Sequence, residues 1–177
     1  SNEKTVVLEA GGLRLNASVV GEVPIPINQL RFDIFEAGAG ETDQALIQRG
    51  VTANDIVTVN SGTYHVVSYF GDVNAVVRAD LRVEPGQLTD AVLYHRAQQL
   101  GFKLVSVSGS EAIADVEWTV QNNNGETVYT NIGAFPSTVL EEGDYVVLAK
   151  RGTDVFNRAF QVVAGQPREI EVLTTVY

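Results

Sequence analysis

The 177-residue chain contains no cysteine and no methionine, one tryptophan and two histidines. Without cysteine it can form neither a disulfide framework nor a thiolate metal site. Such a chain suits an exported bacterial protein, because it folds without an oxidase. The missing methionine and the start at Ser1 and Asn2 indicate a cleavage scar. No run of 18 apolar residues occurs, so no segment is predicted to cross a membrane.

Basic residues are also scarce, with 12 Lys and Arg against 22 Asp and Glu and a formal net charge of −10. Nucleic acids and anionic membrane surfaces bind clustered cations, so we expect neither as a partner. The acidity is expected to keep the protein soluble. The composition is 45% hydrophobic, which is enough for a core, and the length allows one large or two small domains.

The chain repeats itself. Four blocks recur in the same order: GLRLNAS with GFKLVSV, LRFDIF with VEWTVQ, VNSGTYHVVSY with LEEGDYVVLAK, and RADLRVEPGQLTDAVL with RAFQVVAGQPREIEVL. This predicts a duplication with one repeat at 11–95 and a second at 96–177. Residues 1–10 are then the scar plus the last strand of a preceding repeat, at Thr5 to Leu8, so we expect a fragment of a longer array.

Alternation of apolar and polar residues predicts β-strands throughout. Leu30, Phe32 and Ile34 share one face of a strand, and Val116, Trp118 and Val120 share one face of its counterpart. The Asn-Gly pair in NNNGE lies between two strand patterns and predicts a type I′ hairpin. TDQALIQRG is ambiguous: a strand or loop is favoured over a short helix. The fold class predicted is all-β, with two tandem antiparallel β-sandwich domains of about seven strands each.

The third block carries a Gly-x-Tyr-x-Val motif in both copies. In a sandwich, a tyrosine at the start of a late strand places its ring against the core, and its hydroxyl bonds the backbone a few residues upstream. Glycine allows the tight corner and valine enters the core. The predicted structural corners are Gly62, Tyr64, Val66, Gly143, Tyr145 and Val147, and the predicted core aromatics are Phe32 and Trp118.

The same motif, followed by FQVVAGQPREIEVL, resembles the transthyretin-like sandwich of carboxypeptidase-regulatory-like domains and the B-type repeats of collagen adhesins. Over nearly the whole chain, AGGLRLNA, the stretch around SGTYHVVSYF and GAFPSTVLEEGDY are similar to a tandem-repeat exported protein of alpha-proteobacteria. This resemblance implies an extracytoplasmic β-array, periplasmic or associated with the cell envelope. It carries no catalytic residues to this chain.

A search for chemistry gives only weak candidates. Neither His65 nor His95 lies near a Gly-x-Ser-x-Gly elbow, so both are expected to be satisfied or exposed. Calcium at Glu36, Glu41 and Asp43 is disfavoured because the acids lack the spacing of a calcium loop, and a solvated loop is expected. The acidic doublet Glu141 and Glu142 occupies the corner turn and is interpreted as turn residues. Lys103 lies where some adhesin repeats form a Lys–Asn isopeptide, but the matching last strand offers no Asn.

The hypothesis favoured is a non-catalytic structural spacer or protein-interaction module of the bacterial envelope, with no cofactor and no metal. The alternative is a carbohydrate-binding accessory module, for which the partner would be a glycan. Its candidate platform residues are aromatics near strand ends: Phe35, Tyr69, Phe70, Tyr129 and Phe135. An enzyme has no support in the sequence beyond scattered acids.

Overall fold

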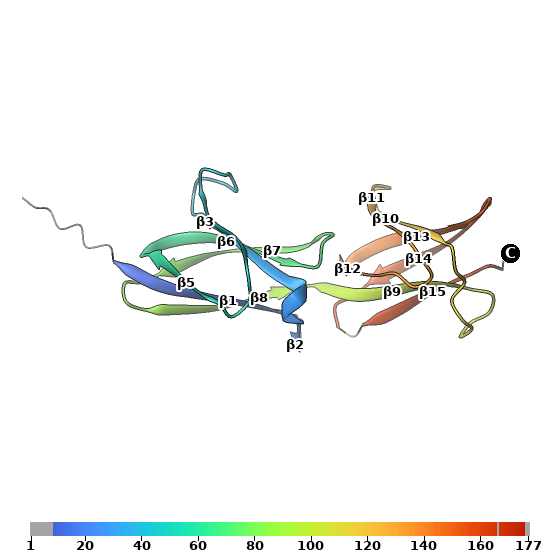
Figure 1. The fold of residues 1–177 in the computed structure, drawn as a ribbon, viewed down its shortest axis with the longest axis horizontal. Helices are drawn as coiled ribbons and strands as arrows, with labels where there is room; N and C mark the ends of the chain where they lie inside the picture. Colours follow the sequence, from blue (N-terminus) through green and yellow to red (C-terminus); the bar gives the residue numbers. More distant parts are fainter. Residues whose placement is uncertain (1–8, 166, 176–177) are drawn as a thin grey trace, which may run out of the picture. The chain divides into compact units, whose positions relative to one another are not determined.

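A computed structural model describes residues 9–165 and 167–175 and divides the chain into two compact units (Figure 1). The described part of unit 1 comprises residues 9–18, 24–70 and 76–94, and that of unit 2 comprises 19–23, 71–75, 95–165 and 167–175. The predicted last strand of a preceding repeat, Thr5 to Leu8, lies outside the described residues.

Unit 1 is built around two sheets. Its strands are β1 (Ala10–Val19), β2 (Val23–Pro24), β3 (Leu30–Glu36), β4 (Leu46–Val51), β5 (Ile56–Asn60), β6 (Gly62–Phe70), β7 (Ala75–Val83) and β8 (Leu88–His95), with a 3-10 turn at Ile27–Gln29. In one sheet β1 pairs with β5 and β8 and with the short β2; the other sheet has the order β4-β3-β6-β7.

Unit 2 also contains two sheets. Its strands are β9 (Ala97–Val105), β10 (Glu117–Asn122), β11 (Thr127–Ile132), β12 (Ser137–Glu141), β13 (Gly143–Arg151), β14 (Asp154–Val162) and β15 (Arg168–Leu173). The strand orders are β12-β9-β15 and β11-β10-β13-β14. These orders repeat those of unit 1 when β9 is matched to β1 and β10 to β15 are matched in turn to β3 to β8. The two-residue β2 of unit 1 has no counterpart in the described part of unit 2. The predicted all-β fold class is confirmed.

The sheet that contains β9 is not wholly antiparallel. The first and last strands of unit 2, β9 and β15, run parallel with Lys103 opposite Glu171. Parallel neighbours need a long crossover connection, and the whole of the second sheet supplies it here.

The core of unit 2 lies between its two sheets. Phe102 of β9 is fully buried and its ring lies against three others, Trp118, Tyr129 and Phe160, at centroid distances of 5.9, 6.4 and 5.7 Å. Trp118 buries its indole and donates its Nε1–H to the Gly133 carbonyl at 2.9 Å. Buried aromatic nitrogens need such a partner, so this bond fixes the ring within the core.

Unit 1 follows the same pattern of alternate burial. Leu13 and Leu15 of β1, Phe32 and Ile34 of β3, and Val66 of β6 are all fully buried. In β1 every second side chain is buried, as its sequence predicts, whereas β3 also buries Asp33 and Phe35 on its other face.

The predicted type I′ turn at Asn124 and Gly125 is wrong. Of the described non-glycine residues only Glu22, Asn54 and Asp115 have positive φ, so Asn124 does not adopt the backbone of that turn. Instead the Asn122 side chain accepts hydrogen bonds from the backbone N–H groups of Asn124 and Glu126, both at 3.0 Å. The Asn122 amide thus stabilises a longer turn in which only Gly125, with φ of 78°, is left-handed.

The ring cluster predicts a large loss of stability on truncation. Phe102→Ala should lower the free energy of unfolding by about 3–5 kcal/mol, because it removes buried surface and leaves a cavity. Trp118 is the only tryptophan of the chain, so its fluorescence during urea unfolding reports on unit 2. Phe135→Ala is the matched control: that ring is 52% exposed and its loss should change stability by about 0.5 kcal/mol or less. Equal effects of the two substitutions would contradict this view of the core.

Candidate functional site

Both corner tyrosines make the same bond. The Tyr64 hydroxyl donates to the Asn60 carbonyl at 2.5 Å, and the Tyr145 hydroxyl donates to the Glu141 carbonyl at 2.6 Å. Each acceptor lies four residues upstream, at the end of the strand that precedes the corner. Burial is the main cause that raises the pKa of both phenols, which keeps each one protonated and able to donate.

The glycines and valines of the two motifs occupy matching places. Gly62 and Gly143 both have φ of 157°, a conformation that side-chain-bearing residues rarely adopt. A Cβ on Gly143 would lie 3.6 Å from the Tyr145 ring. Val66 and Val147 are fully buried. The motif therefore supplies the corner, its hydroxyl lock and an inward side chain.

Unit 2 adds one contact to its corner. Asn74, which belongs to unit 2, donates from Nδ2 to the Tyr145 hydroxyl at 3.0 Å and accepts at Oδ1 from the Glu141 backbone N–H at 2.8 Å. The Asn74 amide therefore bonds both residues of the corner hydrogen bond, the donor Tyr145 and the acceptor Glu141.

A polar network that the sequence did not predict lies on the outer face of β6 and β7 in unit 1. His65 lies between two carboxylates, with Nε2 2.9 Å from Glu41 and Nδ1 2.8 Å from Asp80. Arg78 donates to the same Glu41 carboxylate at 2.7 Å. The hydrogen bonds to Glu41 and then Asp80 raise the pKa of His65, and the bonds from Arg78 and His65 lower the pKa of Glu41.

Glu41 belongs to a loop at 37–45 that this network attaches to the sheet. Ala45 at the end of the loop is buried with Phe35 and Val67 in a small apolar cluster. Its carbonyl accepts the Glu36 backbone N–H at 2.8 Å. The loop expected to be solvated is therefore anchored at Glu41 and Ala45, while Asp43 near its end is almost fully exposed.

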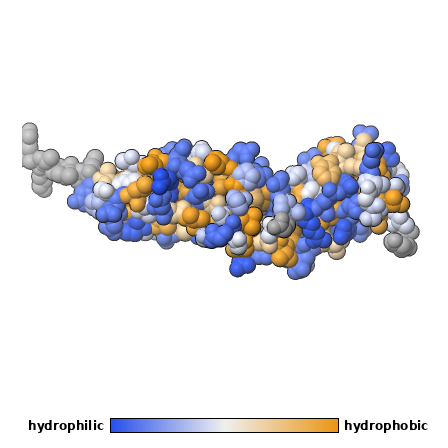
Figure 2. Space-filling model, turned by 90° about the horizontal axis from the view of Figure 1, so that it is seen from below, coloured by the Kyte–Doolittle hydropathy of each residue, from blue (hydrophilic) through white to orange (hydrophobic). Residues whose placement is uncertain are grey.

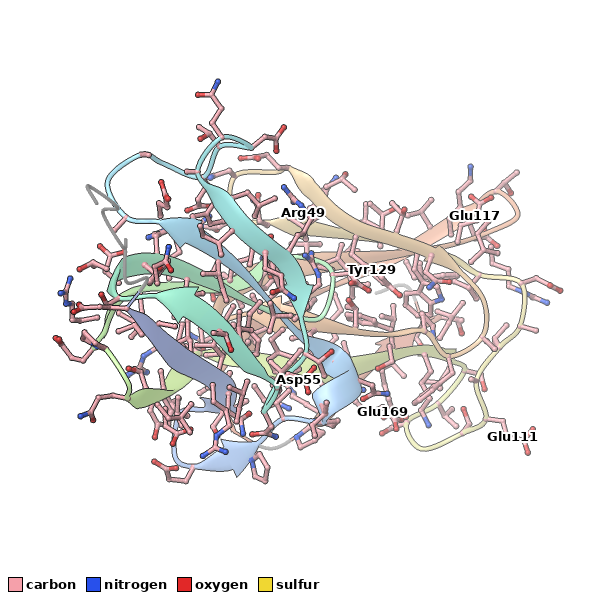
Figure 3. All side chains as sticks on the ribbon, turned by 60° about the vertical axis from the view of Figure 1, so that its left-hand side comes forward. Arg49, Asp55, Glu111, Glu117, Tyr129 and Glu169 are labelled. Atoms are coloured by element: carbon pink, nitrogen blue, oxygen red, sulfur yellow. The ribbon has the colours of Figure 1, made fainter. Side chains whose placement is uncertain are left out.

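The neighbouring strand β3 carries a buried carboxylate. Asp33 is 1% exposed and accepts the Gly50 backbone N–H at 2.9 Å. The Arg49 guanidinium, labelled in Figure 3, lies 3.7 Å from Asp33 and 3.5 Å from Asp43. Burying a carboxylate is costly unless donors surround it, and these groups supply them.

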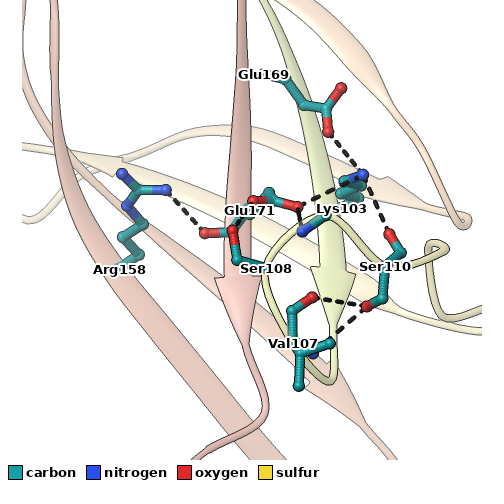
Figure 4. Close-up of polar contacts among 8 residues, drawn as sticks. Lys103, Val107, Ser108, Ser110, Arg158, Glu169 and Glu171 are labelled. Carbon is teal, nitrogen blue, oxygen red and sulfur yellow. Dashed lines mark hydrogen bonds and ion pairs between the residues drawn. The ribbon is translucent and has the colours of Figure 1, made fainter.

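A second network lies on the outer face of β9 and β15 in unit 2 (Figure 4). Lys103 lies 2.9 Å from Glu169 and 3.5 Å from Glu171, and its ammonium donates to the Ser110 carbonyl at 3.2 Å. Glu171 also accepts the Gly109 N–H at 2.8 Å and the Ser108 hydroxyl at 3.1 Å, and the Gly109 bond is the main cause that lowers its pKa. These bonds attach the connection between β9 and β10 to the sheet.

Unit 1 has a simpler pair at the corresponding strand. Arg14 on β1 holds Asp90 on β8 through two bonds of 2.5 and 3.0 Å. Lys103 has the position of Arg14 in the repeat, and its partners are Glu169 and Glu171 rather than an Asn. Its contacts are therefore those of an ion pair.

A hollow of about 470 Å³ adjoins this second network. Its lining residues come from the β9–β10 connection, β14, β15 and the residues after β15: Ser108, Asn157, Arg158, Glu171, Leu173 and Thr175. Arg158 spans it, since its guanidinium donates to the Glu171 carbonyl at 2.9 Å.

The remaining candidates have structural contacts. His95 is 1% exposed, and burial lowers its pKa to about 4. Glu142 accepts the Ala164 N–H at 3.3 Å and lies 3.4 Å from Arg96, while Glu141 supplies the corner carbonyl. Residues 9–165 and 167–175 contain no group of three His, Cys, Asp or Glu side chains arranged to hold a metal ion. Across the same ranges, none of the helices is long and apolar enough to span a membrane.

The aromatic platform residues are dispersed. Phe35 and Phe70 are buried, and Tyr69 lies under the Arg31 guanidinium at 3.9 Å. Tyr129 is half-buried against the Phe102 ring. Only Phe135 of the five is exposed, and its ring lies over Gly101, where a Cβ would be 3.2 Å away. On the face that Figure 2 shows, apolar and polar residues are intermixed.

Comparison with known proteins finds a similarity to the second copy. Residues 99–174 match the model of the Rhizobiales growth-associated tandem repeat domain. The match lies within unit 2 and covers less than half of the chain. The predicted resemblance to a tandem-repeat protein of alpha-proteobacteria is confirmed. No curated protein matches the chain.

Solved structures give weaker similarities. The streptococcal ancillary pilin is 12% identical with a TM-score of 0.44, over 96% of this chain and 63% of that one. The minor pilin GBS52 of Streptococcus agalactiae is 13% identical with a TM-score of 0.37, and the match covers 94% of this chain and 97% of that pilin. The Bacillus anthracis TIE protein is 16% identical with a TM-score of 0.38 over 93% of this chain, which spans only 34% of its length.

The corner bonds predict a graded loss of stability. Tyr64→Phe and Tyr145→Phe should each lower the free energy of unfolding of their unit by about 1–2 kcal/mol, because each leaves a carbonyl without its donor. Tyr145→Phe should cost more, since it also removes the acceptor of Asn74. Trp118 fluorescence should shift to lower urea for Tyr145→Phe. No shift would show that the hydroxyl adds nothing to the corner.

The two histidines predict opposite responses to pH. Because its pKa is raised, the stabilisation from His65 is fully present below about pH 6.5 and is lost as the pH rises through its folded pKa. His95 has the opposite effect, because its pKa is lowered to about 4 in the folded protein. As the pH drops from about 6.5 towards 4, the imidazole is protonated in the unfolded chain but not in the folded one, so the free energy of unfolding falls. NMR titration of the two imidazoles measures both values directly. A His65 that titrates below the ordinary value would contradict the Glu41–His65–Asp80 network.

Proposed function

We propose that this chain is a non-catalytic, extracytoplasmic β-sandwich repeat module that acts as a structural spacer or a protein-interaction domain in the bacterial envelope. The observation that carries the proposal is the repetition of one seven-strand topology with the same hydroxyl lock in both units. A duplicated sandwich adds length or surface rather than a second copy of a reaction site.

The polar networks support the same function. The Glu41 and Glu171 carboxylates, the best connected in each unit, are bonded to side chains and backbone of their own unit. Such closed sets anchor loops and stabilise faces. Of the perturbed groups Glu41, His65 and Glu171, only Glu171 lines the hollow, whereas a catalytic site would bring several such groups together in one cleft. The family match adds that repeats of this kind occur in tandem and are described as growth-associated.

A second candidate, carbohydrate binding, rests on Phe135. Its exposed ring borders a hollow of about 350 Å³ that Gln99, Ser137 and Glu169 also line. An aromatic face beside amide, hydroxyl and carboxylate groups suits a sugar ring. Phe135→Ala should abolish binding on a glycan array if this function holds, and an array with no hits for the unaltered protein removes it.

Fractionation and growth of the source organism test the proposed function. We expect the parent protein in the envelope or periplasmic fraction, and recovery from the cytoplasm would overturn the location. Growth should be impaired when Phe102→Ala is introduced into the parent protein, because unit 2 then unfolds.

Surface variants separate a spacer from an interaction domain. Ile132→Ser and Phe135→Ala alter side chains that are 75% and 52% exposed, so both should leave the fold intact. Unchanged growth with both supports a spacer, and impaired growth with native Trp118 fluorescence supports a binding surface. Normal growth with Phe102→Ala would contradict any role for a folded unit 2.

A further inference from the structure

Two strands of equal length each end a four-stranded sheet, one in each unit. β7 (Ala75–Val83) is the last strand of β4-β3-β6-β7, and β14 (Asp154–Val162) is the last strand of β11-β10-β13-β14 (Figure 1). Both end on a buried valine, Val83 and Val162. The carbonyl before each valine is capped from the strand that follows: Arg82 O accepts the Thr89 hydroxyl, and Gln161 O accepts the Arg168 guanidinium. The two edges are equivalent when they are aligned on these valines, an alignment that differs by one residue from the sequence match of Arg78 with Arg158.

The edge of unit 1 carries charges. Counted back from the final valine, its outer-face positions are Arg82, Asp80, Arg78 and Val76. Arg78 pairs with Glu41, Asp80 with His65, and Arg82 with Glu84. Charged side chains along an edge strand are a known means of preventing another strand from pairing with it.

The edge of unit 2 carries none at the same positions. Gln161, Ala159, Asn157 and Val155 replace Arg82, Asp80, Arg78 and Val76, and Val155 is 53% exposed. β14 is also regular: it pairs with β13 without a register shift from Gly143 opposite Val162 to Arg151 opposite Asp154. A long and regular edge with an uncharged outer face is a template for a further strand.

The free backbone groups of β14 belong to these same residues. Asp154 closes a two-residue hairpin with Arg151, so the even-numbered residues bond β13 and the odd-numbered ones direct their N–H and C=O groups away from it. The Arg168 bond to the Gln161 carbonyl agrees with this parity. Val155, Asn157 and Ala159 thus offer outward backbone groups.

We propose that β14 is an interaction surface for β14 of a second copy of this chain, paired antiparallel about Asn157. In this register Asn157 faces Asn157 of the second copy, and Val155 faces Ala159, so outward groups meet outward groups on both strands. Centring the pair on Arg158 would place two guanidinium groups opposite each other, and that register is excluded by like charge.

Charge complementarity favours a second copy as the occupant. Gln161 would face Thr153 of the other copy, which places the Asp154 carboxylate of that copy beside Arg168. Two-fold symmetry makes this contact twice. Within residues 9–165 and 167–175, Asp154 makes no ion pair, whereas Arg168 is already held at the edge by its bond to the Gln161 carbonyl. A surface with an uncharged centre, flanked on each side by an Asp154–Arg168 pair between the two copies, is self-complementary.

Sedimentation equilibrium and cysteine cross-linking test this pairing on the whole chain. The protein should shift from monomer to dimer as its concentration rises. Ala159→Asp, which restores the charge found at Asp80, should weaken dimerisation at least about 10-fold. Because the chain has no cysteine, Asn157→Cys introduces a single thiol. It should form a disulfide-linked dimer under mild oxidation, since paired strands bring their Cα atoms within disulfide range.

Matched controls use β11, the opposite edge of the same sheet. Thr130→Asp should leave dimerisation unchanged and Thr130→Cys should not cross-link, with native Trp118 fluorescence in every variant. A protein that stays monomeric at all concentrations, a dimer that survives Ala159→Asp, or equal cross-linking at Thr130 would each overturn the proposal.

Discussion

The hydrogen bond from each corner tyrosine to a carbonyl four residues upstream is the interaction on which the rest of each unit depends. It joins the end of one strand to the start of the next at the point where the chain passes from one sheet to the other. A sandwich has two faces to bury, and it can do so only if this passage holds the sheets in register. The glycine that precedes each tyrosine makes the passage sharp, and the valine that follows it enters the core.

The interior could be predicted from the sequence because its signal is local. Alternation identifies Phe32, Trp118, Val66 and Val147 as inward residues, since side-chain direction in a strand follows from position alone. The Gly-x-Tyr motif likewise spans a few neighbouring residues. The turn at Asn122–Gly125 could not be predicted from the Asn-Gly pair alone. The Asn122 side chain accepts the backbone N–H groups of the turn, so the turn does not need two residues with positive φ.

The polar networks could not be predicted because their members are far apart in the sequence. Glu41 and His65 are brought together by the loop at 37–45, which no periodicity describes, and Lys103 meets Glu171 only because the first and last strands are neighbours. Knowing that β9 pairs with β15 would have been enough to place Lys103 opposite an acid. The sequence contains each charge, and only the topology says which charges meet.

Duplication separates what a sandwich needs from what it can vary. Both units keep the matched strand order and the hydroxyl lock. The outer faces differ: unit 1 has an anchored loop and charged outer-face residues on β7, whereas unit 2 has a short hairpin and uncharged outer-face residues on β14. Stability alone explains the shared part. Stability does not explain why the outer-face side chains are charged on β7 and uncharged on β14, because both strands pack inward in the same way. Selection for binding at a single edge would produce this difference.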